Sequence, residues 1–207
     1  MYGAGELTLD MMRSATIQRR TKETDITVTV ELDGQGLAEI STGIGFFDHM
    51  LRHLAKHGGF NLTVKARGDL EIDPHHTVED VGICLGQAML KAVGTPTGLQ
   101  RFGHAVVPMD EALAEAAVDF SGRPYLVFRA EIPKVKLGDF DAELAEEFMR
   151  AFAMNSRITL HLLVRYATNV HHAVEVMFKA CARALGQALV VDSSSTSIPS
   201  TKGVIEA

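Results

Sequence analysis

The 207-residue chain contains no tryptophan, only two cysteines and no long apolar run. A helix that spans a membrane needs about 20 apolar residues, so no membrane span is expected. The N-terminus lacks the charged-then-apolar profile of a signal peptide. Cys84 and Cys181 lie in apolar, helix-like patterns, which indicates reduced core residues. These absences together predict a cytoplasmic protein.

Basic residues are also fewer than acidic ones, 20 against 26, which gives a net charge of −6 with no basic run. This balance argues against a nucleic-acid-binding protein. The hydrophobic fraction of 46% and the charged fraction of 22% are those of a globular protein with ample material for a core. Histidine, in contrast, is abundant, with nine residues.

Four of these histidines lie in a motif that occurs nearly twice, as DPHHTVED at 73–80 and as NVHHAVE at 169–175. In each copy a helix-capping residue precedes a His-His pair, and Glu follows the first His by four places. The first His and the Glu therefore share one helix face. Imidazole and carboxylate are ligands of Zn, Mn and Fe, so the duplication favours a metal site over an ordinary surface.

The rest of the sequence repeats one order of elements. Alternating Val, Ile and Thr residues predict strands, and apolar residues at helical spacing predict helices. An Asp-Gly pair at 33–34 predicts a hairpin turn. We therefore predict an α+β fold made of a duplicated half-domain of about 90 residues, with helices packed on one face of each sheet. The predicted strands are 15–24, 25–32, 37–41, 60–66, 105–109, 113–120, 125–132 and 158–166, and the helices are 46–56, 74–93, 143–154 and 171–188.

Four segments follow from this pattern. We assign 1–12 to an N-terminal extension, 13–103 to the first half, 104–192 to the second half and 193–207 to a tail. The Ser/Thr-rich composition of the tail is typical of a linker. A single Lys and a closing Gly leave open an anion-binding loop.

The duplication also predicts further ligands. The two halves can be aligned from their His-His motifs towards the N-terminus, with a loop that differs by two residues between the halves. In this alignment His49 and Glu147 occupy equivalent positions. Each half then offers four ligands, and adjacent histidines point in different directions, so one of each pair can serve a neighbouring site. Helix geometry alone does not say which one. The eight candidates, enough for two metals, are His49, His75, His76, Glu79, Glu147, His171, His172 and Glu175.

The remaining histidines lack a duplicated partner. His53, His57 and His104 are interpreted as structural or surface residues, and His161 as a core residue. The candidate set contains nitrogen and oxygen ligands without sulfur, which suits Mn²⁺, Fe²⁺ or Zn²⁺.

Several segments resemble the imidazoleglycerol-phosphate dehydratase family of histidine biosynthesis. They are RxTxET, GIGFFDHML, HHTVED, LQRFG, PMDEAL, SGRPY, NVHHAVEVMFKACARAL and PSTKGV, and they span 14–204 in the family's order. The resemblance implies two similar halves, each with a four-stranded sheet, and homo-oligomers built from trimers into a twenty-four-subunit shell. It also implies active sites between subunits with two Mn²⁺ ions.

Carried over residue by residue, the resemblance implies one metal held by His49, His75, Glu79 and His172. The other would be held by His76, His171, Glu175 and the residue at position 147. The family has His at that position, whereas this chain has Glu147.

The activity implied is dehydration of imidazole glycerol phosphate to imidazole acetol phosphate. Two metals that grip the imidazole nitrogens favour the ring anion, which can expel the neighbouring hydroxyl. Glu23 matches the family's non-ligand catalytic glutamate, and Glu175 is expected to share in proton transfer. Glu23 and His49 are also expected to contact the substrate. The matching phosphate-binding residues are Arg101, Arg123, Lys179, Ser200, Thr201 and Lys202.

Two alternatives remain open at this point. A dinuclear hydrolase of phosphate esters would also use two metals, but such sites usually contain Asp and bridging carboxylates. Metals that only join subunits would leave Arg101, Arg123 and Lys202 without a reason to lie near them. The expected partners are a small phosphorylated imidazole and further copies of the chain, with no nucleic acid and no membrane.

Overall fold

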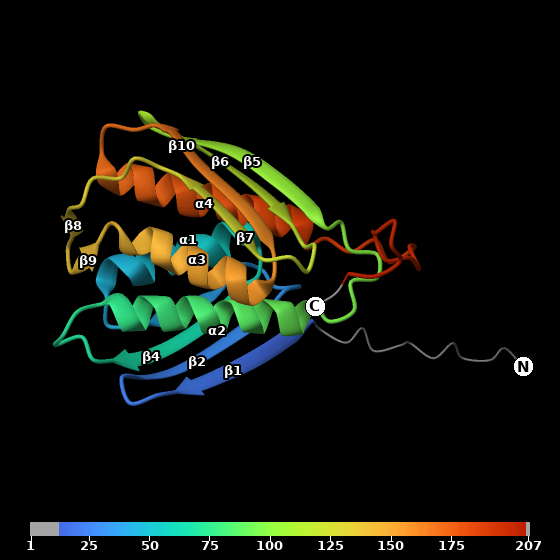
Figure 1. The fold of residues 1–207 in the computed structure, drawn as a ribbon, viewed down its shortest axis with the longest axis horizontal. Helices are drawn as coiled ribbons and strands as arrows, with labels where there is room; N and C mark the ends of the chain where they lie inside the picture. Colours follow the sequence, from blue (N-terminus) through green and yellow to red (C-terminus); the bar gives the residue numbers. More distant parts are fainter. Residues whose placement is uncertain (1–12, 206–207) are drawn as a thin grey trace, which may run out of the picture.

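Two four-stranded sheets enclose a layer of helices in the computed structural model, which describes residues 13–205 (Figure 1). The extension predicted at 1–12 lies outside the described residues. In each sheet the first two strands are antiparallel neighbours and the last two in the order are parallel. The first sheet has the order β1-β2-β4-β3, with β1 (Ser14–Arg20), β2 (Thr24–Glu31), β3 (Ala38–Ser41) and β4 (Asn61–Gly68).

The second sheet repeats this arrangement in the order β5-β6-β10-β7. The predicted α+β fold with duplicated halves is therefore confirmed. The strands of this sheet are β5 (Phe102–Met109), β6 (Ala112–Asp119), β7 (Tyr125–Arg129) and β10 (Thr159–Tyr166). A small additional ribbon consists of β8 (Lys136–Leu137) and β9 (Phe140–Asp141).

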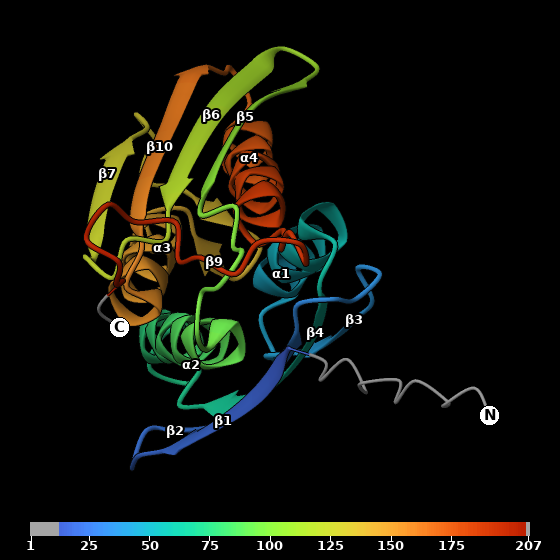
Figure 2. The same ribbon diagram turned by 90° about the vertical axis from the view of Figure 1, so that its right-hand side faces the viewer.

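Four helices fill the space between the sheets, as the turned view in Figure 2 also shows. They are α1 (Gly45–Gly58), α2 (His75–Val93), α3 (Leu144–Ser156) and α4 (Val170–Ala188). Helix α1 packs mainly on α4, and α2 packs mainly on α3. Each half thus places its first helix against the second helix of the other half, so the two halves share one core.

One local prediction was wrong. The Asp-Gly pair does not make a hairpin, because β4 lies between β2 and β3. Instead Asn61 Oδ1 accepts hydrogen bonds from the amides of Gln35 and Leu37 at 2.9 and 3.0 Å. Helix α1 then carries the chain across, so that β3 and β4 pair in parallel. Local turn chemistry cannot report which strand fills the neighbouring position.

Both motif helices begin at a side-chain hydrogen bond. Asn169 caps α4 and accepts from the amide of His171 at 2.9 Å. Asp73 accepts a hydrogen bond from the amide of His75 at 2.7 Å. Helix α2 begins at His75, one residue after Pro74. The first His of each pair is therefore fixed at a helix start. Over the described residues, none of the helices is both long and apolar enough to cross a membrane.

Candidate metal centre and active site

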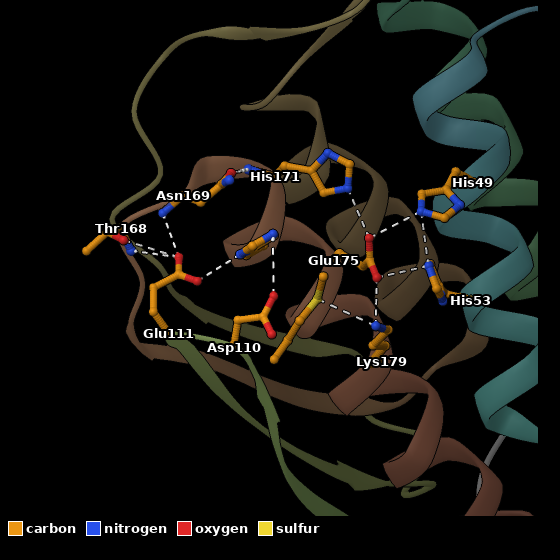
Figure 3. Close-up of polar contacts among 11 residues, drawn as sticks. His49, His53, Asp110, Glu111, Thr168, Asn169, His171, Glu175 and Lys179 are labelled. Atoms are coloured by element: carbon orange, nitrogen blue, oxygen red, sulfur yellow. Dashed lines mark hydrogen bonds and ion pairs between the residues drawn. The ribbon is translucent and has the colours of Figure 1, made fainter.

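Side chains from α1 and α4 converge on Glu175 (Figure 3). Its Oε2 lies 3.0 Å from His171 Nε2 and 3.2 Å from His49 Nε2. One ligand atom from each of the three residues lies within 4.8 Å of the others, which is a suitable arrangement for one metal ion. The carboxylate is buried, and both imidazoles are partly exposed. His171 and Glu175 are four residues apart in α4, so they lie on the same helix face. The packing of α1 on α4 brings His49 to this pair.

This grouping differs from the one that the family resemblance implied. His49 was expected to share a metal with His75 and Glu79, yet in the single chain it lies beside His171 and Glu175. The reason is the exchange of helices between halves, which sequence spacing does not reveal. We therefore regroup the candidate ligands by the helix pairs that the fold brings together.

His53 is a cluster residue that the sequence analysis missed. Its Nε2 lies 3.1 Å from Glu175 Oε1 and 3.1 Å from His49 Nε2. It had been interpreted as structural or surface, but only 19% of its side chain is exposed. The spacing of four from His49, and of four again to His57, was the available signal, because such residues share a helix face. The His53 and His57 rings are stacked, with centroids 5.4 Å apart.

Charges within the cluster keep the Glu175 carboxylate ionised. Burial alone would raise the pKa of Glu175, but hydrogen bonds with Lys179 and His171 and the nearby positive charges lower it to about 2. Lys179 Nζ lies 2.6 Å from Glu175 Oε1. Burial lowers the pKa of His53 to about 4, so this ring is neutral at pH 7. An ionised carboxylate beside a neutral imidazole can donate lone pairs to a metal.

An equivalent place lies between α2 and α3. His75 and Glu147 line one pocket of about 330 Å³, together with Glu143 and Glu146. Glu79 follows His75 by one helical turn but is not among the lining residues. The first cluster opens onto a pocket of about 520 Å³ that His49, His171 and the β8–β9 turn line. Each exchanged helix pair thus borders a pocket, but within residues 13–205 the candidate ligand atoms meet closely only at α1 and α4.

The second histidine of each pair is held by a different carboxylate. His76 Nδ1 lies 3.0 Å from Asp69 Oδ2, and His172 Nδ1 lies 2.8 Å from Glu111 Oε2. These hydrogen bonds raise the pKa of each imidazole. In its neutral form, an imidazole that donates its Nδ1 hydrogen to a carboxylate keeps its Nε2 lone pair available to bind a metal ion. Glu23, the predicted catalytic residue, has Oε2 4.0 Å from His76 Nδ1.

The predicted phosphate-binding residues divide into two groups. Lys179 lies in the Glu175 cluster. Arg101 instead donates to Asp119 Oδ1 and to the carbonyl of Pro199 in the tail, each at 2.7 Å. Arg123 lies 3.9 Å from the other oxygen of Asp119. Ser200, Thr201 and Lys202 follow in the same tail segment, where Lys202 N donates to Ser200 Oγ.

The arginine group lies at the far end of α4 from His171. The amide of Arg101 donates to the carbonyl of Ala188, the last residue of α4, at 3.0 Å. At 1.5 Å per residue, the helix between His171 and Ala188 is about 25 Å long. The two groups therefore do not form one site within a single chain.

Similarity to known proteins places this chain, with its duplicated α+β fold and its histidine–glutamate cluster, in the hydro-lyase class of enzymes. The family model of imidazoleglycerol-phosphate dehydratase matches residues 42–185. The chain therefore belongs to the imidazoleglycerol-phosphate dehydratase family.

Full-length relatives and solved structures agree with this assignment. The imidazoleglycerol-phosphate dehydratase of Gluconobacter oxydans is 59% identical over 93% of this chain and 98% of its own length. That of Symbiobacterium thermophilum is 58% identical over 93% of each chain. The crystal structure of the Staphylococcus aureus enzyme matches with a TM-score of 0.79 at 41% identity, covering 86% of this chain and 99% of its own. The Pyrococcus furiosus structure matches with a TM-score of 0.78 at 37% identity, covering 91% and 99%.

Proposed function

We propose that the protein dehydrates imidazole glycerol phosphate to imidazole acetol phosphate in histidine biosynthesis, in the cytoplasm, with two Mn²⁺ ions per chain. The convergence of His49, His171 and Glu175 is the observation that carries this proposal. Two imidazoles and an ionised carboxylate, without sulfur, form a donor set that suits Mn²⁺. The family supplies the substrate class.

His49, His171 and Glu175 would hold one metal. His75 and Glu147 line the α2–α3 pocket, and we assign them to the second metal together with Glu79, which lies outside the pocket lining, on the strength of the family resemblance. His76 and His172 are available to complete the sites of neighbouring copies. When bound, the metals would act as Lewis acids that hold the substrate imidazole and favour its ring anion.

Proton transfer then falls to a carboxylate that is not a ligand. A pKa of about 2 makes Glu175 a good ligand and a weak base. Glu23 has a side chain that is 56% exposed and free of strong pairing, and it lies beside the candidate ligand His76. We therefore assign the main proton transfer to Glu23, with Glu175 acting mainly on the metal.

The phosphate group requires a second copy of the chain. The arginine group of one copy lies about 25 Å along α4 from its own His171, which is far longer than the substrate. Arg101, Arg123, Ser200, Thr201 and Lys202 would thus serve a cluster of another copy, whereas Lys179 would serve its own. This geometry favours the homo-oligomer of trimers, up to twenty-four subunits, that the family implies.

The deciding experiment incubates the assembled, Mn²⁺-reconstituted protein with imidazole glycerol phosphate. We expect the ketone product, followed by NMR, and no release of inorganic phosphate. Absence of the ketone would contradict the proposal. Release of phosphate would instead favour a dinuclear phosphoesterase, although the Glu175 cluster lacks the aspartates typical of such enzymes. Metals that only join subunits would leave the assembled protein without either activity.

A further inference from the structure

A buried carboxylate joins α2 to the turn that carries Glu23. Asp80 is only 7% exposed. Its Oδ1 accepts a hydrogen bond from Arg19 Nε at 2.9 Å, and its Oδ2 accepts from Thr24 Oγ1 at 2.6 Å. Arg19 is near the end of β1, and Thr24 begins β2. Asp80 therefore binds both strands where they flank the turn.

Two threonines close the turn around Glu23. Thr21 Oγ1 accepts hydrogen bonds from the amides of Glu23 and Thr24, each at 3.0 Å. The amide of Thr21 donates to the carbonyl of Thr24 at 2.9 Å. The backbone of Glu23 is thus fixed while its carboxylate stays exposed beside His76. Because Asp80 follows His76 by four residues in α2, one helix face carries both the anchor and the histidine.

The duplicated motif indicates that the fold itself does not need this carboxylate. HHTVED ends with Asp80, whereas its repeat HHAVEV ends with Val176, which is fully buried. A buried charge destabilises a protein unless it is well paired, so an apolar residue is the simpler choice for packing. In the second half the β5–β6 turn is held differently, because Glu111 bonds directly to His172. At this position of the motif, the carboxylate occurs in the half whose turn carries Glu23 and is replaced by Val176 in the other half.

We propose that Asp80 is a positioning residue for Glu23. Through Arg19 and Thr24 it fixes the β1–β2 turn against α2, and this holds the Glu23 carboxylate beside His76. The inference rests on the proposed role of Glu23 in proton transfer. Loss of the anchor displaces the carboxylate and slows proton transfer, while the metal ligands and the phosphate-binding residues are unaffected.

Thr24→Val tests the anchor, because it removes the hydroxyl that donates to Asp80 and keeps the shape of the side chain. We expect kcat for the dehydration to fall about 10- to 100-fold, with KM changed less than about twofold and metal content unchanged. Thr24→Ser keeps the hydroxyl, so its kcat should equal that of the unmodified protein. Thr29→Val is the matched control, since it removes a hydroxyl contact with Thr16 in the same hairpin. An unchanged kcat in Thr24→Val, or an equal loss in Thr24→Ser, would overturn the proposal.

Glu23→Gln combined with Thr24→Val tests whether the anchor acts through Glu23. If it does, Thr24→Val lowers kcat by no more than about twofold in the Glu23→Gln background. A second loss as large as that of Thr24→Val alone overturns the proposal.

Crystal structures separate the positioning claim from the proposed function. We expect the Glu23 carboxylate of Thr24→Val to move beyond its present 4.0 Å from His76 Nδ1. A carboxylate that stays in place overturns the positioning claim, whatever the activity. An unchanged kcat in Glu23→Gln alone overturns instead the role of Glu23 in the proposed function.

Discussion

At the scale of single residues, Glu175 is the side chain on which the cluster is centred. Both of its oxygens are used, one by His49 and His171 and the other by His53 and Lys179. Removal of its charge would leave the Lys179 ammonium group without its carboxylate partner in the cluster. The residue is therefore the shared hydrogen-bond and ion-pair partner that links α1 to α4 in the cluster.

Glu175→Gln is expected to reduce the metal content of the reconstituted protein from two ions to about one per chain, because a neutral amide is a poor metal ligand. Elemental analysis after gel filtration measures this directly. Glu115→Gln is the matched control, since Glu115 pairs only with Arg165 on the outer face of the second sheet. A metal content equal to that of the control would refute the assignment of Glu175 as a ligand.

His53 gives a pH-dependent prediction for the metal-free protein. Burial lowers its pKa to about 4 in the folded state, against 6.5 for the ordinary side chain. Between these values the unfolded chain binds a proton that the folded chain does not, so the free energy of unfolding rises with pH across this window. His53→Gln should make that rise about 1–3 kcal/mol smaller, as measured by urea denaturation from pH 4 to pH 7. The exposed His104→Gln serves as the control, and equal slopes in the two variants would contradict the burial of a neutral His53.

At the scale of secondary structure, close helix contacts determine which ligands meet. Gly82 and Gly86 of α2 face α3, and Gly186 of α4 faces Gly58 of α1. A Cβ atom at Gly86 would lie 2.7 Å from the carbonyl oxygen of Phe152. These glycines allow the exchanged helix pairs to approach closely, and the pairs in turn bring the candidate ligands of the two halves together.

Gly86→Ala should therefore destabilise the protein by about 1–3 kcal/mol, because α2 must move away from α3. The same change in an exposed helix interior would instead stabilise by about 1 kcal/mol. Gly45→Ala, where an added Cβ meets no atom within 4 Å, is the control and should change stability little. Chemical denaturation measures both variants. A Gly86→Ala protein as stable as the control would show that the α2–α3 contact is not tight.

The secondary-structure elements could be predicted from the sequence, but the way the helices pair could not. The strands, the four helices and the candidate ligands followed from local periodicity and from the doubled motif. The α1–α4 and α2–α3 pairing did not, because it depends on packing between residues far apart in the chain. For the same reason the predicted hairpin at 33–34 was wrong and the metal grouping of His49 changed. His53 was missed although its spacing of four from His49 in the sequence placed both residues on one helix face.

At the scale of the whole molecule, the chain carries two incomplete parts of a site. The Glu175 cluster lies at the start of α4, and the arginine group with Asp119 and Pro199 lies at its end. His76 and His172 lie outside the Glu175 cluster, each with its Nδ1 paired to a carboxylate, and the Nε2 of His172 lies 3.9 Å from Asp110 Oδ2. Under the proposed function, a substrate that needs both an imidazole-binding cluster and a phosphate-binding group would therefore lie between copies.

Complementation between two inactive variants tests this central claim most directly. His171→Asn removes a cluster ligand, and Arg123→Gln removes a phosphate-binding cation. Co-expressed chains with different tags are purified as mixed oligomers, and mass spectrometry establishes their composition. If each site takes its cluster from one copy and its arginine from another, some sites in the hybrids are intact, and dehydratase activity rises well above that of either variant alone. Hybrids no more active than the two separate variants would show that each chain uses its own arginine, which contradicts the account.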